Sequence, residues 1–184
     1  MNIALQKANQ ADLQTVTTLL NDGTRNKVSR GDLAWGTADH NPNAIQRMLD
    51  QGILYLAVSE QRPVGVCALA WQDQSMWGQQ PTDAGYIQRF AIAGGQGGQQ
   101  IGTQMLDLML AEVEQNGRTY LRLAVPSGNA KLRSYYESRG FTRADHRVKN
   151  DARPVYTAAY YERHKEQDEV IPIVKSSFLS RFFK

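Results

Sequence analysis

The alternation of hydrophobic and polar positions predicts helices and strands in a mixed order. Residues 2–7 alternate and predict a first strand. A helical period follows from Asn9, a suitable N-cap, to Gly23, where we expect the helix to end. Residues 24–41 are mostly polar and predict a loop, and a second helix is expected over 42–52.

The middle of the chain predicts a hairpin followed by a strand and a long helix. The stretches 53–59 and 64–71 are rich in strand-forming residues and are separated by a tight turn. A polar loop over 72–83 precedes a strand over 86–93. A strong 3.6-residue period over 98–115 then predicts an amphipathic helix.

The last part of the pattern completes a sheet. A short strand is predicted over 120–125, then a helix that ends at Gly140, then two strands from Phe141 onward and over 155–161, around a turn at 150–151. Strands and helices in this order predict an α/β fold, a mixed sheet covered by about four helices.

Composition places the protein among ordinary globular chains. Of its 184 residues, 41% are hydrophobic and 21% charged, and the net charge of +3 is scattered, which argues against a nucleic-acid partner. The single cysteine, Cys67, lies in an apolar run and is interpreted as core rather than as a nucleophile. No apolar run is long enough for a membrane span and the N-terminus does not resemble a leader, so a cytoplasmic location is expected.

Four glycines in five residues join the strand over 86–93 to the following helix. Glycine allows close approach of the backbone, and a helix N-terminus offers unpaired N–H groups with partial positive charge. Such a turn suits a pyrophosphate, although a flexible loop that caps the helix is the alternative. The dinucleotide fingerprint fails because Gln100 follows Gly95 and Gly97, and the phosphate-loop motif fails at Thr103.

In this context the chain resembles the GCN5-related N-acetyltransferase (GNAT) family, from about residue 3 to 162 and most densely over 86–141. The family signature, whose backbone amides cradle the coenzyme A pyrophosphate, falls on residues 97–102; Gly97 and Gln100 depart from its usual residues. The resemblance implies a sheet splayed between the fourth and fifth strands, with pantetheine in the gap. The coenzyme-binding residues implied are Phe90, Ala91, Ile92, Gly97, Gly98, Gln99, Gln100, Ile101, Gly102, Thr103, Asn129 and Tyr136.

A second motif, Asn129 to Phe141, resembles the family's ending, in which the asparagine contacts pantetheine and the tyrosine at Tyr136 lies near the sulfur. The implied reaction is transfer of an acetyl group from acetyl-coenzyme A to an amine of a small molecule or peptide. Tyr136 is the candidate general acid, with a purely structural aromatic as the alternative. Asp83 is a candidate base, and a water relay is equally acceptable. No metal is expected, because His40 and His164 lack partners at ligand spacing.

The amine acceptor is expected to meet the variable segments. The candidate substrate residues are Trp35, Trp77, Tyr86 and Gln88. For the two tryptophans, which lie in polar loops, an anchor that folds onto the domain is as good an interpretation. Three carboxylates, Asp32, Asp73 and Asp83, could attract a cationic amine, and the alternative for each is a solvated side chain without that role.

We divide the chain into an acetyltransferase domain over 1–163 and a C-terminal tail over 164–184, which carries a short amphipathic pattern. The tail is expected to dock on its own domain or on a second subunit in a homodimer, and a membrane-surface element is the weaker alternative. Two other functions stay open. One is a module of the same fold that senses acyl-coenzyme A without turnover, and the other is an interaction protein that uses the aromatic tail.

Overall fold

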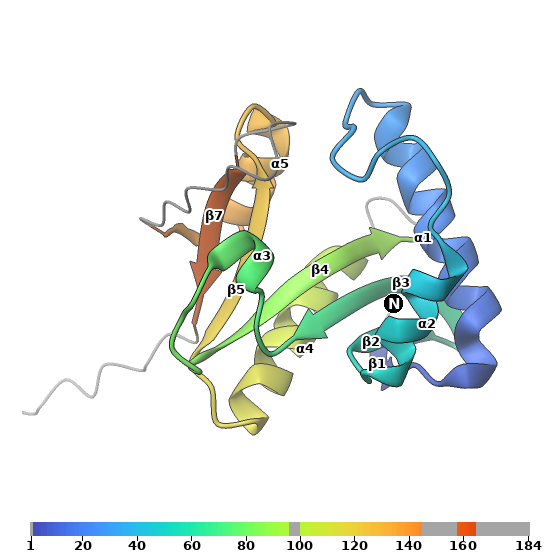
Figure 1. Cartoon of the computed structure of the whole chain (residues 1–184), viewed down its shortest axis with the longest axis horizontal. Coiled ribbons are helices and arrows are strands. Elements are labelled where there is room, and N and C mark those ends of the chain that lie inside the picture. The colour runs from blue at the N-terminus through green and yellow to red at the C-terminus, as the bar shows by residue number, and fades with distance from the viewer. Residues whose placement is uncertain (1, 96–99, 145–157, 165–184) are drawn as a thin grey trace, which may run out of the picture.

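The computed structural model describes residues 2–95, 100–144 and 158–164, and within them a single seven-stranded sheet forms the centre of the molecule (Figure 1). Every neighbouring pair of strands is antiparallel except β4 and β5. This arrangement confirms the expected mixed, mostly antiparallel sheet. In their order across the sheet, the strands are β1 (Ala4–Lys7), β2 (Leu54–Ser59), β3 (Arg62–Ala70), β4 (Ala84–Ile92), β5 (Tyr120–Pro126), β7 (Ala158–Arg163) and β6 (Thr142–Arg143).

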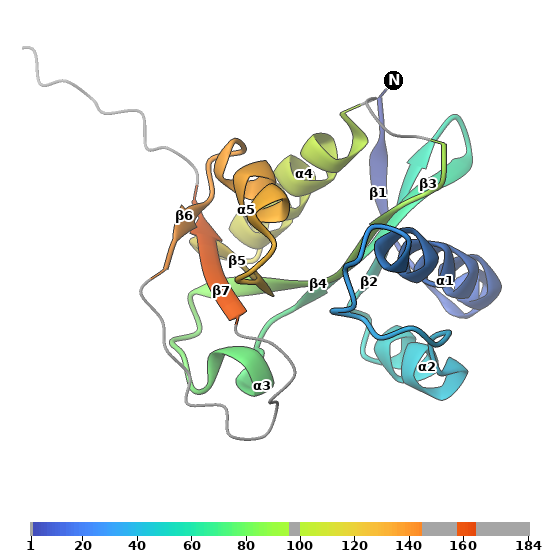
Figure 2. The same cartoon turned by 90° about the horizontal axis from the view of Figure 1, so that it is seen from above.

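Helices cover both faces of the sheet (Figure 2). In the described part of the chain they are α1 (Leu13–Val28), α2 (Pro42–Asp50), α3 (Gln74–Trp77), α4 (Ile101–Gln115) and α5 (Ala130–Glu137), with a 3₁₀ turn, η1, at Gln10–Asp12. The helices α1 and α2 pack on one face, and α4 lies along the other. Each face therefore has its own apolar core.

The first helix begins where the sequence predicted and ends later. Asn9 caps η1, because its side chain accepts from the Ala11 N–H while Asp12 accepts from the Asn9 N–H, a reciprocal capping box. The prediction that Gly23 ends the helix is wrong. A side chain at Gly23 would come within 2.8 Å of the Ala91 Cβ atom, so the glycine lets α1 lie close to β4. The loop that follows α1 is correspondingly shorter than 24–41.

Other predictions have clear outcomes. The loop over 72–83 contains the short helix α3, which Asp73 caps by accepting from the Met76 N–H. Cys67 is fully buried in the core between the sheet and α4, and burial raises the pKa of its thiol, as expected for a packing residue. The turn at 150–151, residues 155–157 and nearly all of the C-terminal tail lie outside the described residues. Among the helices that are described, none has the length and apolarity to cross a membrane.

Candidate active site

The strands β4 and β5 diverge like the arms of a V (Figure 1). They pair only over their first three residues, from Ala84 opposite Tyr120 to Tyr86 opposite Arg122. Beyond this point β4 runs on to Ile92 without β5 beside it. A cleft of about 230 Å³ lies in the opening and is lined by both strands, α3, α5 and the loop after α1. The splay implied by the family resemblance is therefore present.

Arg122 holds the closed end of the V together. Its side chain is 8% exposed and donates to Asp83 at 2.9 Å, to Glu162 at 3.1 Å and to the Tyr86 hydroxyl at 3.3 Å. These contacts tie the start of β4 to β5 and β7. Because Asp83 and Tyr86 are engaged here, the structure does not bring them into the lining of the cleft with Tyr136.

Trp77 belongs to the same closed end. Its side chain is buried, 2% exposed, with edge-to-face contacts to the rings of Tyr86 and Tyr160. The ring anchors α3 to the sheet, and that position brings other α3 residues, Ser75 and Met76, to the cleft wall. The position of Trp77 therefore agrees with the interpretation that it anchors its loop onto the domain.

A β-bulge turns two consecutive residues of β4, Gln88 and Arg89, toward the same face of the sheet. Gln88 pairs with Ala68 and Ala91 with Val66, so two residues, Arg89 and Phe90, stand opposite the single residue Cys67 of β3. Arg89 has a left-handed backbone, with φ of 51°. Gln88 donates to Asp73 on α3 at 2.9 Å, and Arg89 lies under the Trp35 ring, whereas Phe90 packs toward α4. The strict alternation that the sequence suggests is therefore broken, which brings Arg89 into the cleft.

The backbone of β4 beyond the bulge has an open edge toward β5. The Ala93 N–H donates to the Val64 carbonyl at 2.9 Å, on the β3 side. Since successive residues of a strand direct their amides to opposite edges, the Ile92 N–H points into the opening. Ala91, which precedes Ile92, packs against α1 near Gly23. This edge suits a ligand with amide groups of its own.

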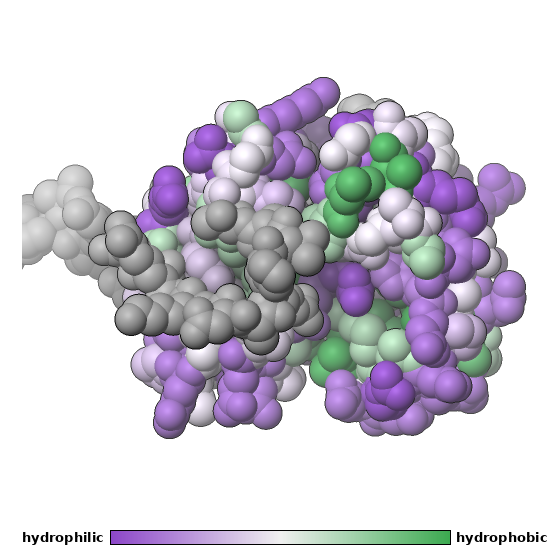
Figure 3. All heavy atoms as spheres, turned by 45° about the horizontal axis from the view of Figure 1, so that its top comes forward, coloured by the Kyte–Doolittle hydropathy of each residue, from purple (hydrophilic) through white to green (hydrophobic). Residues whose placement is uncertain are grey.

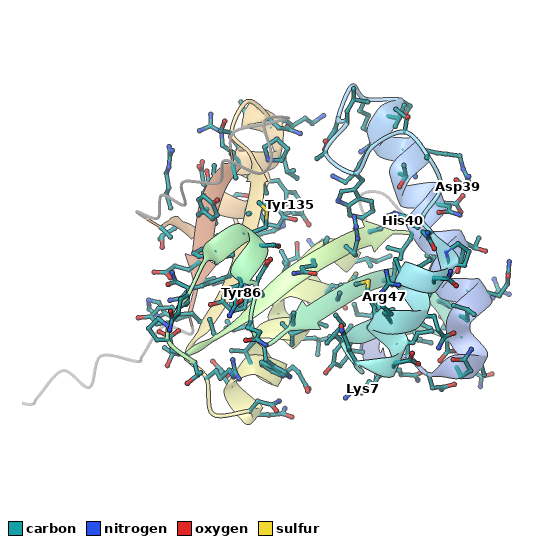
Figure 4. All side chains as sticks on the ribbon, viewed as in Figure 1. Lys7, Asp39, His40, Arg47, Tyr86 and Tyr135 are labelled. Carbon is teal, nitrogen blue, oxygen red and sulfur yellow. The ribbon has the colours of Figure 1, made fainter. Side chains whose placement is uncertain are left out.

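Trp35 forms the wall opposite β5. Lys27 Nζ lies 5.0 Å and Arg89 Cζ 5.7 Å from the centre of its ring, so two cations flank the indole. His40 meets the ring edge-on and contacts the Thr24 hydroxyl at 3.0 Å. Burial and the charge of Arg89 lower the pKa of His40, which favours a neutral imidazole. Figure 4 shows His40 on the α1 side of the opening and Tyr135 on the α5 side.

The N-terminus of α4 lies beyond the tip of β4. Of the predicted phosphate-binding turn, Gly97, Gly98 and Gln99 lie outside the described residues. Gln100 precedes the helix in a left-handed conformation, with φ of 57°, a backbone region that glycine adopts more readily than any other residue. Ile101 and Gly102 are buried in the first turn, which follows Gln100 directly.

Arg139 adds a cation to this helix end. Its Nε atom donates to the Thr103 hydroxyl at 2.9 Å, and its guanidinium lies over the Tyr135 ring, 3.6 Å from the ring centre. The first N–H groups of α4 have no partner within the helix, so together with Arg139 they form an anion-binding arrangement. The motif over 129–141 did not identify Arg139 as a candidate anion ligand, because its position beside Thr103 depends on α5 packing beside α4.

The side chain of Tyr136 lines the cleft, and the residue is 6% exposed. Burial raises the pKa of its hydroxyl above the ordinary value, and the charge of Asp32 adds to this effect while Arg139 opposes it. The hydroxyl therefore stays protonated at neutral pH. Its ring is held edge-on between the rings of Tyr135 and Phe141.

Asn129 and Asp32 join the two walls beside the cleft. Asn129 caps α5 by accepting from the Leu132 N–H at 3.0 Å, and its amide nitrogen lies 3.5 Å from Asp32 on the loop after α1. A second hollow of about 570 Å³ lies between Arg30–Ala34 and Pro126–Lys131 and shares Ala34 and Pro126 with the cleft. Figure 3, turned toward this opening, shows hydrophobic surface beside the hollow between the two halves of the molecule.

Three charged residues line the cleft, and two of them, Lys27 and Arg89, were not identified as site residues from the sequence. Arg89 faces the cleft because of a bulge that no residue pattern predicts. Lys27 lies in the part of α1 that continues past the predicted end of the helix. Asp73 was one of three carboxylates considered for an amine, and it alone of the three lines the cleft. The position of Asp73 at the start of α3 was predictable from the sequence, since aspartate is a typical N-cap residue.

Comparisons with known proteins agree with this geometry. Among solved structures the fold is similar to a GNAT-family acetyltransferase from Listeria monocytogenes, at 16% identity and TM-score 0.73, covering 89% of this chain and 95% of that one. It is also similar to ribosomal-protein-alanine N-acetyltransferase from Brucella melitensis, at 16% identity and TM-score 0.66, covering 88% of this chain and 99% of that one. A third similar structure is PaiA N-acetyltransferase from Thermoplasma acidophilum in complex with coenzyme A, at 17% identity and TM-score 0.60, covering 90% of this chain and 100% of that one.

Comparison of the sequence with curated proteins and with family models gives one match. No curated protein matches it. The sequence model of the Acetyltransferase (GNAT) family matches residues 16–141, which run from α1 through both walls of the V to the end of the α5 motif. The chain therefore belongs to the GNAT family of acetyltransferases.

Proposed function

We propose that the protein is an acetyl-coenzyme A-dependent N-acetyltransferase that acetylates a primary amine of a small molecule or peptide. The observation that carries this proposal is the position of Tyr136, a buried and protonated phenol in the cleft between two separated strands. Family membership supports acetyl transfer in general, and the similar Thermoplasma structure holds coenzyme A.

The residues around the opening fit coenzyme A. The pantetheine arm would add to the open edge of β4 as an extra strand adds to a sheet. The diphosphate would meet the first turn of α4 and Arg139, which donates to Thr103 in that turn. Asn129 lies at the start of α5, beside the hollow that continues the cleft. Acetyl-coenzyme A supplies the activated acetyl group as a thioester.

In the reaction the neutral amine nitrogen forms a bond to the acetyl carbon and the carbon–sulfur bond breaks. The Tyr136 hydroxyl donates its proton to the leaving sulfur, and the Ile92 N–H polarises the acetyl carbonyl. The amine must lose a proton. We infer that water carries it away rather than Asp83, because Asp83 accepts from Arg122 at the closed end of the V and does not line the cleft.

Thiol release from acetyl-coenzyme A with a panel of amines tests the proposal, alongside calorimetric titration of acetyl-coenzyme A alone. We expect binding of the coenzyme and amine-dependent release of its thiol. Binding without release for any amine would favour the alternative, a module that senses acyl-coenzyme A; the left-handed Gln100 in place of glycine is the observation on its side. Absence of binding at millimolar concentration would overturn both.

A further inference from the structure

We propose that Gln88 orients the acceptor amine for attack through its side-chain carbonyl oxygen, and that Asp73 is the positioning residue that turns this oxygen toward the amine. The inference rests on the proposed function and adds the two residues that direct the amine. It comes from a hydrogen bond between β4 and α3 in the wall of the cleft, where the Gln88 Nε2 atom donates to Asp73 at 2.9 Å.

The contact with Asp73 fixes which end of the Gln88 amide is left for a ligand. An ionised carboxylate has acceptor positions only, so the group of Gln88 that faces it must be the NH2 group. Because the amide is planar, its carbonyl oxygen lies on the other side of the group. Among the described residues no donor contacts the Gln88 Oε1 atom, so this oxygen can accept a hydrogen bond from a ligand in the cleft.

Asp73 is itself held in place by the start of α3. Its Oδ1 atom accepts from the Met76 N–H at 3.1 Å and from the Ser75 hydroxyl at 2.8 Å, whereas its Oδ2 atom accepts from Gln88. The helix is anchored to the sheet by Trp77, which is 2% exposed. The cap and the anchor together keep the Asp73 carboxylate, and through it the Gln88 amide, in one orientation.

An acceptor oxygen is the group that an attacking amine requires. A neutral primary amine has two N–H groups and one lone pair, and it reacts only when the lone pair points at the acetyl carbon. A hydrogen bond from one N–H to Gln88 Oε1 would set that direction and leave the other proton free to pass to water. A donor in the same place would instead bind the lone pair and oppose the attack. Gln88 lines the same cleft as Tyr136, the proton donor to the sulfur.

Asp73→Asn should invert the Gln88 amide. The Met76 N–H keeps the side-chain oxygen at the cap, so the NH2 group of the new side chain replaces Oδ2 and faces Gln88. Gln88 must then turn its oxygen to that group and its own NH2 group to the amine. We expect kcat to fall by about 10- to 100-fold, with KM changed by less than about threefold, because the apolar walls still bind the amine.

A second variant shows whether the two residues act as one unit. Gln88→Leu removes the amide and should lower kcat by a similar factor. Asp73→Asn should then add less than about twofold in the Gln88→Leu background, because its effect is transmitted through the amide. Gln46→Leu and Asp50→Asn are matched controls, since Gln46 donates to Asp50 at 2.8 Å on α2, outside the cleft, and both should leave kcat unchanged.

Thiol release is measured with the full-length protein at saturating acetyl-coenzyme A. Isopentylamine, phenethylamine, ethylenediamine, leucine and alanylglycine are compared, and the amine with the highest kcat/KM serves for the variants. Calorimetric binding of acetyl-coenzyme A by each variant shows that it is folded.

An unchanged kcat in Gln88→Leu would overturn the inference and leave the proposed function in place. A further loss of about tenfold or more when Asp73→Asn is added to Gln88→Leu would also overturn it, because Asp73 would then act on the acceptor directly. If the unmodified protein releases thiol with none of the amines, the proposed function fails and the inference fails with it.

Discussion

The hydroxyl of Tyr135 lies against Gly102, so closely that the first carbon of any side chain at position 102 would collide with it. That carbon would also come within 3.0 Å of Ile92 Cδ1. Tyr135 has little room to move, because its ring is stacked with Arg139 and meets Tyr136 edge-on. Glycine at position 102 therefore lets α4 approach α5, in addition to its expected place in the coenzyme turn.

Gly102→Ala should lower the free energy of unfolding by about 1–3 kcal/mol, since it overpacks the contact between α4 and α5. Chemical denaturation with an unchanged m-value measures this. Gly94→Ala is the matched control, because nothing lies within 4 Å of a side chain at Gly94, and it should change stability by less than about 0.5 kcal/mol. Equal effects of the two variants would contradict the packing role.

Hydrophobic periodicity was sufficient to predict the order of strands and helices, because α4 and the central strands each bury a continuous apolar face. It failed at Gly23 and at Arg89. A glycine near the end of a helical pattern is often a helix stop, but Gly23 lies inside α1 because α1 approaches β4 closely there, a tertiary contact that a single sequence does not show. At Arg89 the bulge breaks the alternation of the strand, and no residue pattern signals it.

Site residues that belong to a recognisable sequence motif could be predicted, whereas residues whose side-chain direction depends on tertiary packing could not. The motif over 129–141 led to Tyr136, and the structure places that residue in the cleft. Tyr86 on β4 was a candidate substrate residue, but its side chain points toward Arg122 and Trp77, where Figure 4 shows it beside α3. Its role as a substrate residue remains a prediction.

Tyr136→Phe should lower kcat by about 10²- to 10⁴-fold with little change in coenzyme affinity, because it removes only the proton donor for the departing sulfur. Steady-state thiol release and calorimetry measure the two quantities. Tyr135→Phe removes a neighbouring hydroxyl that packs between α4 and α5 and should change kcat by less than about threefold. Normal turnover in Tyr136→Phe would assign that ring to packing alone.

The pH dependence of turnover follows from the same phenol. Burial raises the pKa of Tyr136 above its ordinary value near 10, so the protonated, proton-donating form persists as the pH rises. The rate with saturating acceptor should therefore show no loss between about pH 8 and about pH 10. A decline in kcat within that window, abolished in Tyr136→Phe, would show that the hydroxyl ionises earlier than its burial implies.

Arg122→Gln should destabilise the fold by about 2–4 kcal/mol, because it leaves Asp83 and Glu162 without their partner at the closed end of the V. The matched control is Arg25→Gln, whose ion pair with Asp22 joins side chains that are 60% and 41% exposed, so its loss should leave the stability nearly unchanged. Thermal and chemical denaturation give both values. A small effect for Arg122→Gln would show that strand pairing alone holds β4 to β5.

Asp32 should stabilise the protein in a pH-dependent manner. Burial acts to raise the pKa of its carboxyl, but hydrogen bonds from Lys27 and the Ala34 N–H, with the charge of Lys27, outweigh it and leave the pKa below its usual value. A carboxyl with a lowered folded pKa contributes its stability above the unfolded pKa of about 4, and that stability is lost as the pH falls through the folded pKa.

Asp32→Asn should therefore cost about 1–2 kcal/mol at pH 7, and the difference from the unmodified protein should shrink below about pH 4. Urea denaturation across this range measures it. Asp39→Asn, at a side chain that is 66% exposed and paired with Arg25, should show almost no difference at either pH. A difference for Asp32→Asn that stays constant down to pH 3 would mean that the charge of Asp32 contributes nothing, because only the ionised form pairs with the charge of Lys27.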